Sequence, residues 1–162
     1  MDDSQRIPTQ KTSPKDFFLH LLAIATLYAS AINFGTLIFK YIDLALPDPL
    51  SYDTTQWSYG AIRMAISILI IVFPTFILVS RYLNKAYATT PYKRNLWIRK
   101  WLIYFTLFVT ALIMIGDLVA LVNKLLEGAF TASFILKVLT VGFIAGSVFF
   151  YYFQDVRKYK TE

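Results

Sequence analysis

The sequence predicts an all-α polytopic membrane protein, a bundle of four transmembrane helices. Three observations support this class. The 162 residues are 57% hydrophobic and only 16% charged, whereas a soluble domain carries about 25% charged residues. The apolar residues form four runs, each longer than the roughly 20 residues that a helix needs to cross a hydrocarbon core. Lysine and arginine gather beside these runs, as is typical of membrane proteins.

The first predicted span covers residues 14–43. It follows a polar segment, residues 1–12, that we expect to be flexible. Ser13 is placed to act as an N-cap, Pro14 suits the first helical position, and the Asp16 carboxylate can reach back to the cap. The two prolines of LPDPLS end the span. The apolar run is too long for the core of a signal peptide.

The second predicted span covers residues 54–83. Asp53 and Gln56 have the spacing of a capping box at its start. Pro74 lies near the middle of the span and lacks the N–H that a helix requires at that position. We therefore expect a kink in this helix at the proline.

The third and fourth predicted spans cover residues 98–126 and 132–153. A basic and aromatic connector precedes the third span, and the short turn EGAFT separates the two. The four spans together form one transmembrane domain, residues 13–158, and residues 159–162 form a polar tail. The polar segments are too short to form a further soluble domain.

The distribution of positive charge predicts the orientation in the membrane. Twelve of the 16 lysines and arginines lie on the side of the two termini and the middle connector, and the other side holds four. Positive residues favour the cytoplasmic side, so we expect both termini in the cytoplasm. Residues 91–101, which include the end of the connector and the start of the third span, combine basic residues with tryptophan. We therefore expect them to contact anionic lipid headgroups rather than nucleic acid.

Each span brings one polar or charged side chain to a similar depth in the half of the bundle that faces away from the cytoplasm. This predicted polar cluster consists of Asn33, Arg63, Asp117 and Lys137. Further polar residues on the same helical faces are Lys40, Ser67 and Lys124. A charge in hydrocarbon is costly unless it is paired or functional. The cluster is therefore the most informative feature of the sequence.

Two interpretations of the cluster remain open. In a structural network, Asp117 pairs with Arg63 or Lys137 and fixes the order of the helices. In a binding or transport site, the same residues line an outward-facing cavity for a small anion, an ion or a proton. A third possibility is that Lys40, Lys124 and Lys137 extend to the outer interface.

Two smaller features each have two interpretations. Gly142 and Gly146 form a GxxxG pattern, which allows close helix approach within the bundle or between copies. His20 lies about one turn inside the first span. We expect an interfacial histidine there, with proton sensing as the alternative.

Enzyme chemistry finds no support in the sequence. The chain has no cysteine and one histidine, which excludes disulfides, thiolate metal sites and multi-histidine sites within one chain. A Gly-rich phosphate loop, a nucleophile elbow and an HExxH motif are also absent from the sequence. We therefore expect no catalytic, cofactor-binding or metal-binding residues.

The sequence resembles a known family over residues 13–158. The resemblance lies in SPKDFFLHLLAIATLYASAINFGTLIFKYID, AIRMAISILIIVFP, KRNLWIRKWLIYFTLF, GDLVALVNKLL and LKVLTVGFIAGSVFFYYFQDVRK. These runs are similar to the small four-span membrane proteins grouped as domain of unknown function 5671. The resemblance implies a prokaryotic cytoplasmic membrane and four helices. It implies no activity, substrate or cofactor.

The function that these observations favour is a non-enzymatic interaction or assembly subunit of a membrane. Its partner would be another copy or a different membrane protein. The alternative is a small channel or transporter that uses Arg63, Asp117 and Lys137 to bind or pass an ion, a proton or a small anion.

Overall fold

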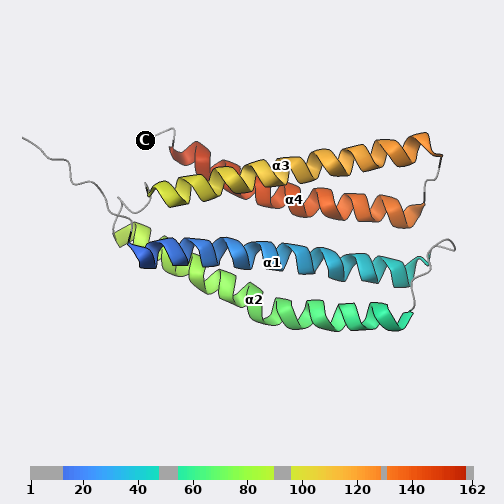
Figure 1. Cartoon of the computed structure of the whole chain (residues 1–162), viewed down its shortest axis with the longest axis horizontal. Coiled ribbons are helices and arrows are strands. Elements are labelled where there is room, and N and C mark those ends of the chain that lie inside the picture. Colours follow the sequence, from blue (N-terminus) through green and yellow to red (C-terminus); the bar gives the residue numbers. More distant parts are fainter. Residues whose placement is uncertain (1–12, 48–54, 90–95, 129–130, 160–162) are drawn as a thin grey trace, which may run out of the picture.

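The computed structural model describes residues 13–47, 55–89, 96–128 and 131–159 (Figure 1). These residues form four α-helices, which are α1 Pro14–Ala45, α2 Thr55–Thr89, α3 Trp97–Leu126 and α4 Ala132–Tyr159. All four are long and apolar enough to cross a membrane. The described ranges contain no strand. The predicted class, an all-α protein with four candidate transmembrane helices, is confirmed.

The four helices form two antiparallel hairpins (Figure 1). α1 packs against α2, and α3 packs against α4. α1 also approaches α4 and, less extensively, α3. Within the described part of the chain, the backbone of α2 approaches neither α3 nor α4. Where α1 ends and α4 begins, the helices lie in a row, α2–α1–α4–α3, with α2 and α3 at its two edges. Toward the opposite end α3 and α4 cross, and α3 approaches α1 there (Figure 1).

The two ends of the bundle can be told apart by the helix termini that lie there. α1 begins and α4 ends at one end, which we call the terminal end (Figure 1). α1 ends and α2 begins at the opposite end, where α3 also ends and α4 begins; we call this the loop end. An even number of spans places the first and last described residues on the same side of a membrane.

The expected helix signals act partly as predicted. Ser13 occupies the N-cap position of α1 and Pro14 its first turn, but the Ser13 side chain makes no cap hydrogen bond. The Phe17 N–H donates instead to the Ser13 carbonyl at 3.0 Å. Asp53 lies outside the described residues. α2 continues through Pro74 and changes direction near its middle (Figure 1), as expected for a missing backbone N–H.

Two helices end six residues later than the sequence predicted. α2 was expected to end at residue 83 and α4 at residue 153, but they continue to Thr89 and Tyr159. The length of an apolar run matches the thickness of the hydrocarbon core, but the helix itself can continue beyond that core. Residues with adequate helix propensity, including lysine and alanine in α2, continue the helix past that boundary.

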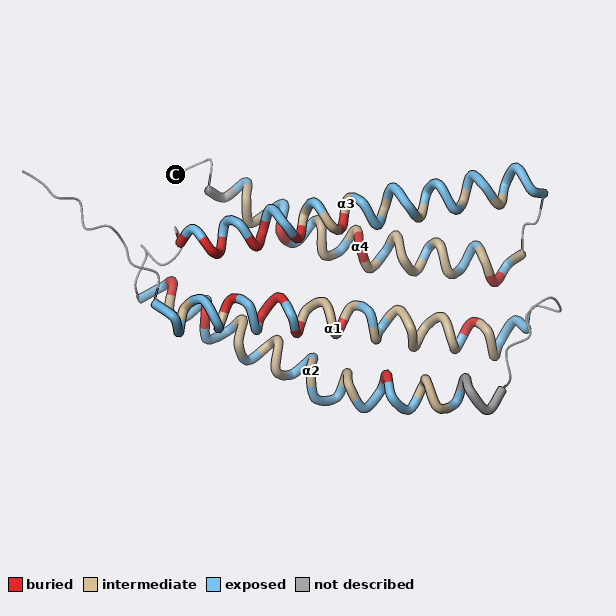
Figure 2. The backbone as a smooth tube through the Cα atoms, in the orientation of Figure 1, coloured by how far each residue is buried: buried red, intermediate tan, exposed pale blue. Residues whose placement is uncertain are grey.

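Most buried residues lie in the terminal half of the bundle (Figure 2). One apolar cluster joins Ile24 of α1 to Leu96, Ile98 and Leu102 at the start of α3. A second cluster, which joins α1 to α2, consists of Ala23, Leu83 and Tyr87, with Leu19 and Val79 packed against it. The loop half has few buried residues among those described. Its helices are therefore held together less tightly.

Candidate functional site

The predicted polar cluster does not assemble as a single network. Lys137 Nζ lies 2.5 Å from Oδ1 of Asp43, so its ion pair joins α4 to the last turn of α1. It also lies over the Phe39 ring, 6.0 Å from its centroid. Asp43 was not expected here, because the sequence does not reveal that α1 and α4 are neighbours. The expected pairing of Asp117 with Arg63 or Lys137 is therefore replaced by a different pair.

Asp117 faces α4 rather than α2. A Cβ atom added to Gly142 would lie 3.7 Å from Oδ2 of Asp117, so the carboxylate lies over this glycine. The residue is partly exposed. Among the described residues it has no ion-pair partner.

Arg63 lies on the exposed side of α2. It has no ion-pair partner within the described ranges, and the backbone of α2 does not approach that of α3, the helix that carries Asp117. Ser67, one turn further along, is also exposed and donates to the Arg63 carbonyl at 2.9 Å. The sequence correctly grouped these two residues on one helical face. It placed that face inside the bundle, whereas the structure places it outside.

The other predicted residues make local contacts. The Asn33 amide donates to the Ala29 carbonyl at 2.7 Å, one turn back along α1. Lys124 Nζ lies 2.7 Å from Oε2 of Glu127, just beyond the end of α3. The hydrogen bond from Lys124, with its positive charge, lowers the pKa of Glu127. Lys40 is partly exposed near the end of α1.

The two glycines of the GxxxG pattern have different surroundings. Gly142 faces Asp117 across the α3–α4 contact, whereas a Cβ atom on Gly146 would meet nothing within 4 Å. The pattern therefore provides one close approach inside the bundle, at Gly142. It does not act there as a pair.

A polar network that the sequence analysis did not predict lies at the terminal end. His20 of α1 is buried, and its Nδ1 donates to the Asp16 carbonyl at 2.6 Å. That bond places a ring proton on Nδ1, and Nε2 is hydrogen-bonded to the Tyr87 hydroxyl of α2 at 2.5 Å. His20 therefore joins two helices, and its expected place at the membrane interface stays a prediction.

Arg99 extends the same network to α3 and α4. Its guanidinium lies 4.6 Å from the centroid of the Tyr87 ring, and Nη2 donates to Oδ2 of Asp155 at 2.6 Å. The Arg99 side chain is only 10% exposed and that of Asp155 27%, so the charge is largely removed from solvent and paired. We call His20, Tyr87, Arg99 and Asp155 the terminal network; it contains one residue from each helix.

A cavity of about 70 Å³ adjoins the terminal network. Ser80 and Asn84 of α2 and Tyr151 of α4 contribute further polar groups to its wall. The space suffices for a few water molecules but not for an organic cofactor. The chemistry that this site supports is the mutual stabilisation of four helices by buried hydrogen bonds and one ion pair.

Two apolar clefts flank the α1–α4 contact in the middle of the bundle. The larger, about 800 Å³, lies between α1, α2 and α4, and its walls include Leu27, Phe34, Phe73 and Phe143. The smaller, about 350 Å³, lies between α1, α3 and α4. The hairpins therefore meet along a narrow contact.

Comparison with known proteins places the chain in a family. The sequence model of the family described as Domain of unknown function (DUF5671) matches residues 16–152. The chain belongs to this family. No curated protein and no solved structure matches the chain. The resemblance noted in the sequence is thereby confirmed.

The described ranges of this DUF5671 member contain no set of metal ligands. No group of three His, Cys, Asp or Glu side chains there could hold a metal ion. The expectation of a non-enzymatic protein without a cofactor stays a prediction.

Proposed function

We propose that this DUF5671 protein is a non-enzymatic assembly subunit that recognises a partner within the membrane. Arg63 carries the proposal. It is exposed on α2, eight residues inside the helix, and its side chain has no ion-pair partner among the described residues. An arginine in hydrocarbon is stabilised by a carboxylate or by reaching the interface. A partner's carboxylate would satisfy it without the distortion that reaching the interface requires.

The loose packing of the loop half supports the same role. Among the described residues the backbone of α2 approaches only that of α1, and few residues in this half are buried. In Figure 2 the exposed and intermediate positions dominate the loop half of all four helices. An isolated bundle would gain stability by closing these gaps. A subunit that packs against another protein gains the same contacts between chains.

The alternative, a channel or transporter, needs the charged residues to line one cavity. Lys137 instead pairs with Asp43 at 2.5 Å, and Arg63 lies on the opposite edge of the row from the helix that carries Asp117. The larger clefts between the helices have almost entirely apolar walls. This arrangement favours assembly over permeation.

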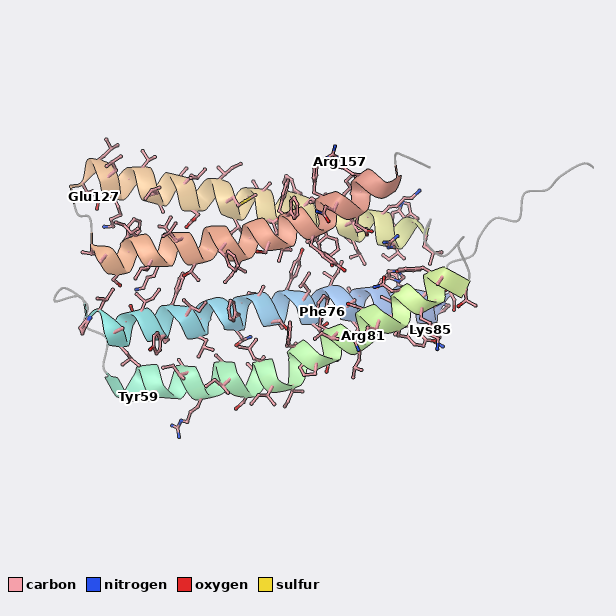
Figure 3. All side chains as sticks on the ribbon, turned by 180° about the vertical axis from the view of Figure 1, so that it is seen from behind. Tyr59, Phe76, Arg81, Lys85, Glu127 and Arg157 are labelled. Atoms are coloured by element: carbon pink, nitrogen blue, oxygen red, sulfur yellow. The ribbon has the colours of Figure 1, made fainter. Side chains whose placement is uncertain are left out.

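We further propose that both termini lie in the cytoplasm of a prokaryotic cell. The excess of lysine and arginine at the terminal end supports this orientation. Trp97 and Trp101 are exposed and stacked at the same end, with ring centroids 6.4 Å apart. Together with Lys100 they form a surface suited to anionic headgroups. Arg81 and Lys85 project from α2 at this end (Figure 3).

The proposal is tested by the mass of the protein released directly from membranes into native nanodiscs. We expect the wild-type chain in a complex larger than a monomer, and Arg63→Gln predominantly as a folded monomer. Arg81→Gln is the matched control, because Arg81 is exposed on the same helix but at the terminal end. A monomeric wild-type protein, or an unchanged complex in Arg63→Gln, would overturn the proposal. Proton or ion flux in liposomes that depends on Arg63 would favour transport.

A further inference from the structure

We infer that the partner is a second copy of this chain, and that Arg63 of one copy pairs with Asp117 of the next. The inference rests on the proposed assembly role and names its partner. The observation behind it is that the fold keeps two opposite charges, Arg63 and Asp117, away from each other. Each lies within a transmembrane helix, and neither has an ion-pair partner among the described residues.

The two charges lie at matching depths. Arg63 is eight residues after the start of α2, and Asp117 is nine residues before the end of α3. At a rise of about 1.5 Å per residue, both lie roughly 12–14 Å from the loop end. Copies of one protein enter the membrane in the same orientation. Arg63 of one copy is therefore level with Asp117 of another.

The arrangement of the helices prevents this pair from forming within one chain. In the loop half, which holds both charges, α2 and α3 lie at opposite edges of the row, with α1 and α4 between them (Figure 1). Between copies, α2 of one chain can pack against the exposed flank of its neighbour's α3, beside Asp117, which faces α4 within its own chain but stays partly exposed. Each copy provides one Arg63 and one Asp117, so a closed assembly satisfies every charge.

The surface beside each charge suits a helix–helix contact. On α3, Gly116 and Ala120 are exposed on the side of Asp117 and have small–xxx–small spacing. A Cβ atom on Gly116 would meet nothing within 4 Å, and the same is true of Gly60, which lies one turn before Arg63 on α2. Small residues let two backbones approach closely. The long Arg63 side chain of one copy can then reach the short Asp117 side chain of the next.

A charge exchange between copies tests the pair directly. Arg63→Asp and Asp117→Arg are made in separate chains that carry different affinity tags. Either variant alone places like charges at the contact, and we expect at least a tenfold loss of self-association. When the two variants are produced together, both contacts regain opposite charges. We then expect each tag to retrieve the other chain at the wild-type level.

Cysteine cross-linking places the contact without removing either charge. The chain has no native cysteine, so Ser67→Cys and Ile113→Cys, each one turn from its charge, give no background. We expect a disulfide-linked pair of chains when the two single variants are combined in membranes and oxidised. Ile115→Cys is the control, because it is exposed at nearly the same depth on the other side of α3.

The outcomes separate the inference from the proposed function. Recovery of association by the mixed charge variants, with cross-links from Ile113→Cys but not from Ile115→Cys, is the expected result. A complex that depends on Arg63 but contains a different protein would overturn the inference and leave the assembly role intact. Folded monomers for both wild-type and variant chains would overturn both. Circular dichroism and melting of each variant identify those that fail to fold.

Discussion

Lys137 of α4 pairs with Asp43 of α1 at 2.5 Å across the loop end of the bundle. The pair joins the two hairpins at the end where few other residues are buried. It also engages one of the two cations that were expected to neutralise Asp117. The fold thus neutralises Lys137 within the chain. It leaves Arg63 and Asp117 to form ion pairs with groups outside the chain.

A double-mutant cycle measures which carboxylate Lys137 holds. We expect Lys137→Gln and Asp43→Asn to be non-additive, with a coupling of about 0.5 kcal/mol or more in the free energy of unfolding, since directly paired residues share their contribution. Lys137→Gln and Asp117→Asn should add within about 0.5 kcal/mol. Reversible unfolding in one detergent gives all the values. Strong coupling to Asp117 and none to Asp43 would contradict the observed pair.

The Arg99–Asp155 pair should contribute strongly to stability. Asp155→Asn leaves the nearly buried Arg99 without its anion, and we expect a loss of about 2 kcal/mol, reduced from the value for a fully buried pair because Asp155 is 27% exposed. Thermal melting in nanodiscs provides the measurement. Lys124→Gln is the control, because its pair with Glu127 is exposed, and the melting temperature should not change. Equal effects of the two substitutions would show that burial of Arg99 is unimportant.

Tyr87 makes two separable contacts. Tyr87→Phe removes the hydrogen bond to His20 but keeps the ring below Arg99, so we expect a loss of about 1 kcal/mol. Tyr87→Leu removes both contacts and should destabilise the protein further, by roughly 0.5–2 kcal/mol. Melting of the two variants in parallel separates the contributions. A Phe variant as unstable as the Leu variant would mean that the ring contact contributes nothing.

The number and positions of the helices were predictable because each depends on local sequence. Apolar runs set the spans, and Pro14 and Pro74 mark a helix start and a kink. The direction of each helix face was not predictable. In a membrane both the lipid and the neighbouring helices are apolar, so hydrophobic periodicity does not show which side faces inward. Arg63 was therefore placed inside the bundle by the rule that charges avoid lipid, and the structure places it outside.

The terminal network was missed for a different reason. His20, Tyr87, Arg99 and Asp155 come from four helices and share no spacing in the sequence. Tyr87 and Asp155 also lie beyond the predicted ends of their spans, residues 83 and 153. The signal that could have found the network was the single histidine, placed about one turn inside the membrane. Only helix adjacency identifies its partner.

The glycines of α4 distinguish packing inside the bundle from packing between copies. Gly142→Leu should destabilise the fold, because atoms beyond Cβ would enter the space of Asp117, which lies 3.7 Å from the Cβ position. Gly146→Leu should be tolerated, because the Cβ position has no neighbour within 4 Å. The measurements are the melting temperature and the mass in native nanodiscs. If Gly146→Leu lowered the mass of the complex without lowering the melting temperature, α4 would form the contact between copies. The pairing of α2 with α3 would then have to be abandoned.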